Sequence, residues 1–240
     1  MKKNNFYEKF EKEVEKLNIK LNNNQIEIFY EFMNLLIEWN KKINLTAITK
    51  PEEIITKHFI DSLTAVKYIK EGDSIVDVGT GAGFPGVPLA IANTTLNITL
   101  VDSINKRINF LNEVINHTGL NNIESIHSRA EEIGKNKHYR ENFDIAISRA
   151  VARLDTLVEY LLPTVKIGGK CICMKGPDCI EEINEAKNAI ETLGGKIEKV
   201  EEFNLPDTDI KRTIIIINKL KNTPEKFPRK AGTPAKEPIK

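Results

Sequence analysis

The chain has 240 residues and a formal net charge of +1, with 40% hydrophobic and 29% charged residues. This length fits one α/β domain with additions and is enough to bury a sizeable core. Because its apolar runs fall short of the roughly 18 residues of a membrane span, and its polar start is unlike a signal peptide, we expect a cytoplasmic protein without membrane association.

Residues 1–70 are predicted to be helical, because they show no strand-like alternation. Two helices are expected over residues 4–17 and 24–42, and a shorter one after Pro51. Apolar residues of the second helix recur at three- and four-residue intervals, which is typical of an amphipathic helix: Ile28, Phe29, Phe32, Leu35, Leu36 and Trp39. We predict that this part forms an N-terminal helical cap.

Residues 71–220 show a different pattern, in which strand-like runs alternate with helical segments. Strands are expected at 74–78, 97–101, 123–127, 143–147 and 170–174, and helices at 86–93, 104–118, 129–134, 152–162 and 179–193. Such alternation implies right-handed crossovers and a parallel sheet.

Two further strands, at 196–203 and 212–218, follow without a helix between them and must pair antiparallel. A seven-stranded α/β sheet with a reversed last strand is the Rossmann-like arrangement of class I S-adenosylmethionine-dependent methyltransferases. A dinucleotide-binding domain usually has six parallel strands instead.

A glycine-rich turn follows the first predicted strand and reads Asp77-Val78-Gly79-Thr80-Gly81-Ala82-Gly83-Phe84-Pro85-Gly86. Glycine lets the backbone turn sharply and approach a ligand closely, and the helix that begins near the proline offers free N–H groups. We expect a small molecule to bind here, at the carboxyl end of the strand. A tight turn without a ligand is the alternative.

Two ligands suit such a turn. Its last six residues satisfy the dinucleotide fingerprint G-x-G-x-x-G. The Asp77 carboxylate, however, would repel a pyrophosphate and favours a ligand with positive charge, such as the ammonium and sulfonium of S-adenosylmethionine. Asp102, at the end of the next strand, is placed to bind ribose hydroxyls of either cofactor.

The end of the fourth predicted strand, where substrate chemistry is expected, contains Ser148-Arg149-Ala150. It has neither an Asn-Pro-Pro element, which would suit an exocyclic amine, nor the cysteine that pyrimidine carbon-5 methylation needs. A guanidinium is no general base near neutral pH, so the acceptor needs no deprotonation, as is true of guanine N7. We expect Arg149 to be the catalytic residue, which positions the cofactor or the substrate, and a surface ion pair is its alternative role.

Cysteine and histidine residues give no sign of a metal site or a disulfide. Cys171, Cys173 and Cys179 form no C-x-x-C pair, and the four histidines do not cluster at ligand spacing. We expect buried structural thiols and no metal.

Basic residues are concentrated in the last segment of the chain. Residues 219–240 hold seven Lys or Arg and two Glu, which leaves 28 basic and 32 acidic residues before them. Four prolines there predict that residues 221–240 are extended and weakly ordered. With Phe227 beside Arg229 and Lys230, contact with a nucleic-acid backbone is one hypothesis, and a solubility feature is the other.

Further basic residues flank the expected pocket. Lys106 and Arg107, one turn into the helix after Asp102, and Lys175, at the end of the fifth strand, are candidates for phosphate contact. A solvated helix face is the alternative for the first two. His58 and Asp61 are candidates for the acceptor pocket, or for packing.

Six motifs in order resemble the bacterial 16S ribosomal RNA guanine-N7 methyltransferases, whose older family name is glucose-inhibited division protein B. They are Asn44-Leu45-Thr46, His58-Phe59-Ile60-Asp61-Ser62, the glycine-rich turn, Asp102-Ser103 with Lys106-Arg107, Ser148-Arg149-Ala150 and Lys175-Gly176. The ending Phe227-Pro228-Arg229-Lys230-Ala231-Gly232-Thr233-Pro234 resembles that of Gram-positive-type members. The match covers essentially the whole chain.

The resemblance implies transfer of a methyl group from S-adenosylmethionine to guanine N7, in the small-subunit rRNA loop near the decoding site. It also implies cofactor contacts at Gly79, Phe84, Ala130, Glu131 and Arg149, to which the loop geometry adds Gly81. The expected partner is 16S rRNA or the 30S particle, and the expected state is a monomer. A nicotinamide-dependent oxidoreductase and a non-catalytic RNA-binding module stay open as rival readings.

Overall fold

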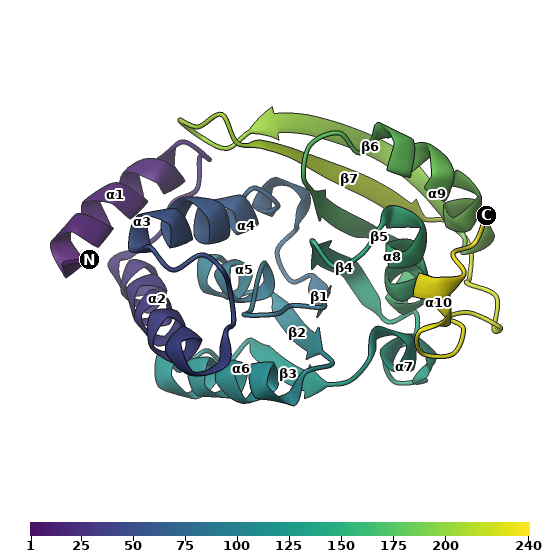
Figure 1. Ribbon diagram of the computed structural model, residues 1–240, viewed down its shortest axis with the longest axis horizontal. Coiled ribbons are helices and arrows are strands. Elements are labelled where there is room, and N and C mark those ends of the chain that lie inside the picture. Colours follow the sequence, from purple (N-terminus) through teal and green to yellow (C-terminus); the bar gives the residue numbers. More distant parts are fainter.

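The computed structural model describes residues 1–240 and is centred on a seven-stranded sheet with the order β3-β2-β1-β4-β5-β7-β6 (Figure 1). The strands are β1 (Ser74–Val78), β2 (Asn97–Asp102), β3 (Ile123–His127), β4 (Phe143–Arg149), β5 (Val165–Lys175), β6 (Gly195–Asn204) and β7 (Lys211–Lys219). All seven predicted strands are present. The fifth begins at Val165 rather than at residue 170, because its pairing with β4 extends back to Phe143.

The sheet is parallel except at its last strand. β1 pairs in parallel with both β2 and β4, and the parallel pairing continues to β3 and β5. β7 runs antiparallel to β5 and to β6, as a short connection requires. The predicted α/β sheet of the class I methyltransferases is therefore confirmed. The strand order reverses between β1 and β4, which is where open α/β sheets bind their ligands.

Helices cover both faces of this sheet. They are α1 (Lys3–Glu15), α2 (Asn23–Ile43), α3 (Pro51–Ile54), α4 (Asp61–Leu63), α5 (Gly86–Ala92), α6 (Asn105–Thr118), α7 (Ala130–Lys135), α8 (Leu154–Leu161), α9 (Ile180–Thr192) and α10 (Thr233–Lys236). A π-helical turn, η1 (Ile55–Ile60), joins α3 to α4, and two 3₁₀ turns are η2 (Val66–Tyr68) and η3 (Leu162–Thr164). None of the helices combines the length and apolarity needed to cross a membrane.

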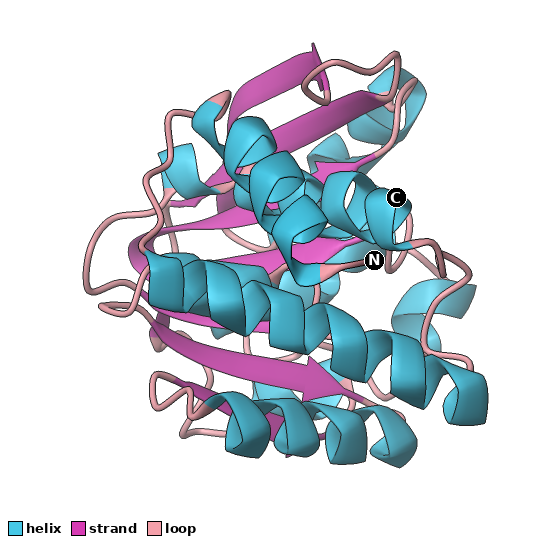
Figure 2. Cartoon of the chain, turned by 90° about the vertical axis from the view of Figure 1, so that its left-hand side faces the viewer, coloured by secondary structure: helices cyan, strands magenta, loops and turns pink.

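Alternating side chains on the strands form two separate cores. In β7, Ile214 and Ile216 belong to the core under α2, α5 and α6, whereas Ile215 and Ile217 belong to the core under α7, α8 and α9. A strand covered on both faces needs such a continuous apolar run. Figure 2, which looks at the molecule from the side of the N-terminal helices, shows helices packed across the strands.

The N-terminal helices pack onto one face of the sheet and share its core. Their aromatic side chains stack on one another, and Phe32 and Phe59 reach Phe84 of the glycine-rich turn, at ring distances of 5.4 and 6.1 Å. A capping box begins α2, since Asn22 and Gln25 each bind the other's backbone N–H at 2.9 Å. The helical cap thus lies directly against the residues expected to form the site.

The cysteines are buried and unpaired, as predicted. Cys171 and Cys173, two residues apart on β5, lie in the same core. Burial raises the pKa of the Cys173 thiol to about 12, so it stays protonated. No three His, Cys, Asp or Glu side chains are grouped so that they could hold a metal ion.

Residues 221–240 are docked on the molecule, and the prediction of a weakly ordered extended tail is wrong. Phe227 is buried against the core under α7 to α9, and α10 lies beside α8. The side chain of Arg229 pairs with Glu159 of α8. Proline content alone gave no sign of these partners, because each is far away in the sequence.

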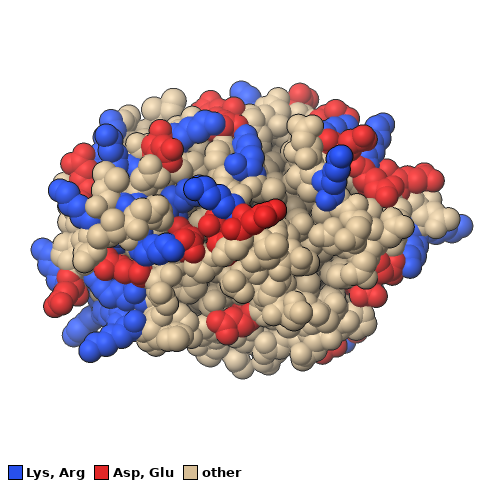
Figure 3. All heavy atoms as spheres, turned by 180° about the vertical axis from the view of Figure 1, so that it is seen from behind, with Lys and Arg blue, Asp and Glu red and all other residues tan.

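On the face opposite to Figure 1, acidic and basic side chains interleave (Figure 3).

Candidate active site

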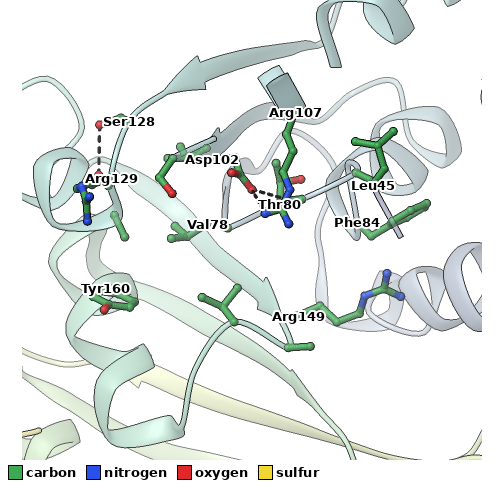
Figure 4. Close-up of a pocket in the computed structure, with 18 of the residues that line it drawn as sticks. Leu45, Val78, Thr80, Phe84, Asp102, Arg107, Ser128, Arg129, Arg149 and Tyr160 are labelled. Carbon is green, nitrogen blue, oxygen red and sulfur yellow. Dashed lines mark hydrogen bonds and ion pairs between the residues drawn. The ribbon is translucent and has the colours of Figure 1, made fainter. Parts of the chain in front are cut away.

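A cavity of about 580 Å³ opens at the carboxyl ends of β1, β2 and β4 (Figure 4). The glycine-rich turn forms its floor, and residues after β3 and from α8 lie at one end. Leu45, Thr46, His58, Phe84 and Arg149 lie at the other end. The strand order reverses between β1 and β4, and this point therefore lies at an open cavity.

Gly79 and Gly81 of the turn both have a positive φ, but only Gly79 is also closely surrounded. Gly79 has φ +71°, and a Cβ added there would lie 2.5 Å from Cγ2 of Val151. Its N–H donates to the carbonyl of Val101 on β2 at 2.8 Å. Gly81 has φ +62°, and the space that its Cβ would occupy is open. The turn is thus a tight backbone cradle with free space above Gly81.

Asp77 holds this turn from beneath instead of facing the cavity. Its Oδ2 accepts hydrogen bonds from the Thr80 hydroxyl at 2.7 Å and from the N–H of Gly86 at 2.8 Å. Burial raises the pKa of the Asp77 carboxyl to about 6, although both hydrogen bonds oppose that rise. Asp77 therefore does not line the cavity, and the first N–H of α5 is bound to Asp77. The preference of its charge for a cationic ligand stays a prediction.

Asp102 lines the cavity and joins the turn to α6. One carboxylate oxygen accepts from the N–H of Gly81 at 2.9 Å and from the guanidinium of Arg107 at 3.2 Å. The other accepts from the N–H of Ile104 at 2.8 Å. These bonds orient the carboxylate at the rim, where the contact with ribose hydroxyls stays a prediction.

Ala130 and Glu131, at the start of α7, line the far end of the cavity together with Tyr160 of α8. Glu131 is 5% exposed, and its Oε1 accepts the N–H of Gly232 from the C-terminal segment at 2.7 Å. One oxygen of this carboxylate is therefore engaged, and the side chain has a fixed direction.

Arg149 leaves the end of β4 and reaches into the N-terminal helices. Its guanidinium donates to the carbonyl of Lys57 at 3.1 Å, to Oδ2 of Asp61 at 3.3 Å and to Nδ1 of His58 at 3.0 Å. It also lies 5.0 Å from the centre of the Phe84 ring. The alternative of a surface ion pair is wrong, because the side chain is only 14% exposed and its partners are buried.

His58 is held in its neutral form. Since Nδ1 accepts from the guanidinium of Arg149, Nε2 carries the proton and donates to the Thr46 hydroxyl at 2.9 Å. Burial, and then the neighbouring Arg149, lower the pKa of His58 to about 3. The backbone of Thr46 is in turn fixed by the Asn40 side chain, at 2.8 and 2.9 Å.

Comparison with known proteins decides the family. The family model described as "GidB: rRNA small subunit methyltransferase G" matches residues 22–214. This chain belongs to the rRNA small subunit methyltransferase G family.

Curated relatives with that name cover nearly the whole chain. Ribosomal RNA small subunit methyltransferase G of Clostridium perfringens (strain 13) is 49% identical over 237 residues, which is 98% of this chain and 99% of the relative. The protein of the same name from Lachnoclostridium phytofermentans is 54% identical over 225 residues, or 93% of each chain.

Solved structures with the same fold are more distant. A SAM-dependent methyltransferase from Aquifex aeolicus has a TM-score of 0.53 and 20% identity, over 72% of this chain and 96% of that one. TYW2 of M. jannaschii in complex with AdoMet has a TM-score of 0.52 and 17% identity, over 66% of this chain and 74% of that one. At such low identity they show the fold alone.

In this methyltransferase G chain, three of the five predicted RNA-binding residues pair with carboxylates of the same chain. Arg107 pairs with Asp102. Lys175 donates to the carbonyl of Ala152 at 2.5 Å and pairs with Glu182. Arg229 pairs with the buried Glu159.

Lys106 and Lys230 are exposed and do not line the cavity. RNA contact by these two stays a prediction. The other three have partners within the chain, which the sequence did not reveal because these carboxylates lie elsewhere in the chain or, for Asp102, were assigned to the cofactor. Their contact with RNA also stays a prediction.

Sequence reasoning missed several residues of this methyltransferase G site. Arg212 of β7 donates to Oδ2 of Asp61 at 2.9 Å, so that two guanidiniums share one buried carboxylate. Tyr160, Gly232 and Ala235 line the cavity from α8 and the C-terminal segment. No local pattern marks Arg212, Tyr160 or Ala235, and Gly232 was noted only as part of the C-terminal motif. Thr46 stood within a noted motif, but no sequence feature indicated its bond to His58, which is 12 positions away.

Proposed function

We propose that this chain transfers the methyl group of S-adenosylmethionine to N7 of a guanine in 16S rRNA, in the loop near the decoding site. The proposal is supported by membership of the methyltransferase G family and by the cavity at the strand ends. The observation that carries it is that the end of the cavity at Arg149 offers a guanidinium and a neutral His58 of low pKa, neither of which can act as a general base.

The cavity has the features that S-adenosylmethionine requires. The backbone of Gly79 and Gly81 provides a cradle for the methionine part, and Asp102 provides an acceptor for ribose hydroxyls. Ala130 and Glu131 are proposed to hold the adenine. When bound, the cofactor supplies a methyl group attached to a positively charged sulfur. An unprotonated nitrogen can take this methyl group by in-line displacement, in which the sulfur leaves as a neutral thioether.

Arg149 and His58, which line the acceptor end of the cavity, are both unsuited to removing a proton. Arg149 is a guanidinium, and His58 is neutral with a pKa of about 3. The Asp61 carboxylate accepts from both Arg149 and Arg212. Amines and hydroxyls that must lose a proton would need a base here. Guanine N7 has a free lone pair in the neutral base, so positioning alone is sufficient.

Arg149 is proposed to act by position. It fixes His58 and lies against Phe84, so that both rings present a rigid apolar surface beside the methyl position. Phe84 contributes by lining the cavity, as the family resemblance implies. The partner is 16S rRNA, free or within a 30S particle, and we propose that the protein acts as a monomer in the cytoplasm.

A direct test uses purified protein, S-adenosylmethionine with a labelled methyl group, and either 16S rRNA or 30S particles. We expect label in 7-methylguanosine on digestion and mass spectrometry, and loss of that nucleoside from rRNA of cells lacking the gene. Label in another nucleoside would overturn the guanine-N7 assignment. Binding of a nicotinamide cofactor without transfer would favour the oxidoreductase, and rRNA binding indifferent to S-adenosylmethionine would favour a binding module.

A further inference from the structure

We propose that residues 223–236, here called the C-terminal strap, form a wall of the cavity and bind the adenine nucleoside half of the cofactor. This inference rests on the proposed function, because it takes the ligand to be S-adenosylmethionine. It replaces the hypothesis that this segment is a free basic arm for RNA.

The strap is fixed at its beginning by backbone carbonyls. The Arg140 guanidinium donates to the carbonyl of Phe227 and to that of Thr223, each at 2.7 Å. The ammonium of Lys219, which is fully buried, donates to the Thr223 hydroxyl at 2.6 Å. The Phe227 ring is 6% exposed. The start of the strap therefore accepts hydrogen bonds from two cations of the folded domain, of which Lys219 also pairs with Glu141.

A buried ion pair fixes its middle. Glu159 of α8 is fully buried, and it accepts from the N–H of Arg229 at 2.8 Å, from Nε at 3.0 Å and from Nη2 at 2.6 Å. A buried carboxylate is costly unless it is paired and hydrogen-bonded. Arg229 provides that partner, so its charge is committed to the interior. The pair also places the residues that follow it over the cavity.

Beyond Arg229 the strap reaches the cavity itself. The N–H of Gly232 donates to Oε1 of Glu131 at 2.7 Å, and the carbonyl of Pro234 accepts from the Thr156 hydroxyl at 3.2 Å. Gly232 and Ala235 both line the cavity. Ala235 is nevertheless exposed, so this part of the strap is not covered by the rest of the protein. The strap thus presents small residues, and not charges, to the cavity.

The position of the strap identifies the part of the ligand that it contacts. Gly232 is hydrogen-bonded to Glu131, and α10, which carries Ala235, packs on α8, which carries Tyr160. Figure 4 shows Tyr160 at the opposite side of the cavity from the guanidinium of Arg149. Asp102, the expected ribose acceptor, lies between the two ends. The group beyond the ribose is the base, and a planar base fits against small side chains and a tyrosine ring. Glu131, directed by Gly232, keeps its second oxygen for an amino group of that base.

Two exposed positions of α10 give a matched test. Ala235→Trp places a large side chain in the base site, whereas Lys236→Trp places the same side chain at a neighbouring exposed position that does not line the cavity. Binding of S-adenosylmethionine and of 5′-methylthioadenosine is measured by calorimetry. We expect Ala235→Trp to weaken both by about tenfold or more, as steric overpacking does, and Lys236→Trp to leave both unchanged.

The outcomes separate the inference from the proposed function. If the wild type binds both ligands and Ala235→Trp binds them equally well, the strap proposal is overturned and the methyltransferase proposal stands. A wild-type protein that binds neither ligand would count against the proposed function itself.

A second variant distinguishes the strap from an RNA arm. Arg229→Gln leaves Glu159 without its ionic partner and should loosen the strap, so affinity for 5′-methylthioadenosine should fall. The salt dependence of rRNA binding should stay as in the wild type, because Arg229 contacts no phosphate in this arrangement. Unchanged nucleoside affinity with a shallower salt dependence would mean that the segment serves RNA, and the proposal would be overturned.

Discussion

The imidazole of His58 lies flat on the ring of Phe84, with 4.3 Å between the ring centroids and an angle of 11° between the planes. This stack joins the π-helical turn η1 to the glycine-rich turn after β1. Since Nδ1 of His58 also binds Arg149, one residue connects the helical cap, the cofactor turn and the end of β4. The N-terminal helices therefore contribute side chains to the candidate site and are not only a cover for the sheet.

Replacing Gly79 should abolish cofactor binding without unfolding the protein. In Gly79→Ala, the positive φ costs about 1–2 kcal/mol, and the new methyl group meets Val151 at 2.5 Å. Calorimetry with S-adenosylmethionine measures the loss, and circular dichroism checks the fold. The double variant with Val151→Ala should recover part of the affinity, because only the contact is relieved. Wild-type affinity in Gly79→Ala would remove this turn from the site.

Arg149→Ala should lose most methyl transfer, by about a hundredfold. The substitution leaves Asp61 with one guanidinium and frees His58, and removing one member of a buried charge network costs about 3–5 kcal/mol. Arg149→Lys should restore the charge but little of the rate, because an ammonium lacks the fork that reaches three partners. Rates and the melting temperature are measured together. Full activity of Arg149→Ala would show that its role is structural only.

His58 makes the protein less stable in mild acid. The unfolded histidine protonates below its ordinary pKa of 6.5, whereas the folded one stays neutral down to about 3, so the unfolded state binds more protons between these values. Stability is full above pH 6.5 and should decline by about 2 kcal/mol at pH 5. Urea titrations of wild type and His58→Gln at pH 5 and 7.5 measure this. An identical pH dependence in both proteins would contradict the neutral assignment.

Asp77 should affect the pH dependence of stability in the opposite direction to His58, and Asp77→Asn tests this. The folded carboxyl, with a pKa of about 6, binds more protons than the unfolded one between pH 3.8 and 6, so its contribution to stability is lost as the pH rises through that range. Relative to wild type, the variant should therefore gain about 2–3 kcal/mol in the free energy of unfolding between pH 4 and pH 7. A constant difference between the two proteins over this range would refute the raised pKa. Asp77→Ala, which loses the acceptor for Thr80 and Gly86, is the control for the hydrogen bonds.

The sequence by itself determined the elements and the place of the pocket. Hydrophobic alternation and helical spacing depend on near neighbours, so the seven strands and the long helices lie close to their predicted positions. The alternating glycines after β1 likewise require their own local backbone, which predicted a ligand cradle at that strand. The run Ile214–Ile217 shows the same logic, since a strand buried on both faces needs apolar residues throughout.

Only the tertiary structure decided which charges meet. Asp61 and Arg212 are 151 positions apart, and Glu159 and Arg229 are 70 apart, yet each pair shares a short hydrogen bond in the interior. A carboxylate in a sequence does not reveal whether it will face a ligand, as expected of Asp77, or fix the backbone beneath it. That choice depends on desolvation and on partners brought by remote elements, which become defined only when the sheet, the helical cap and the C-terminal strap pack together.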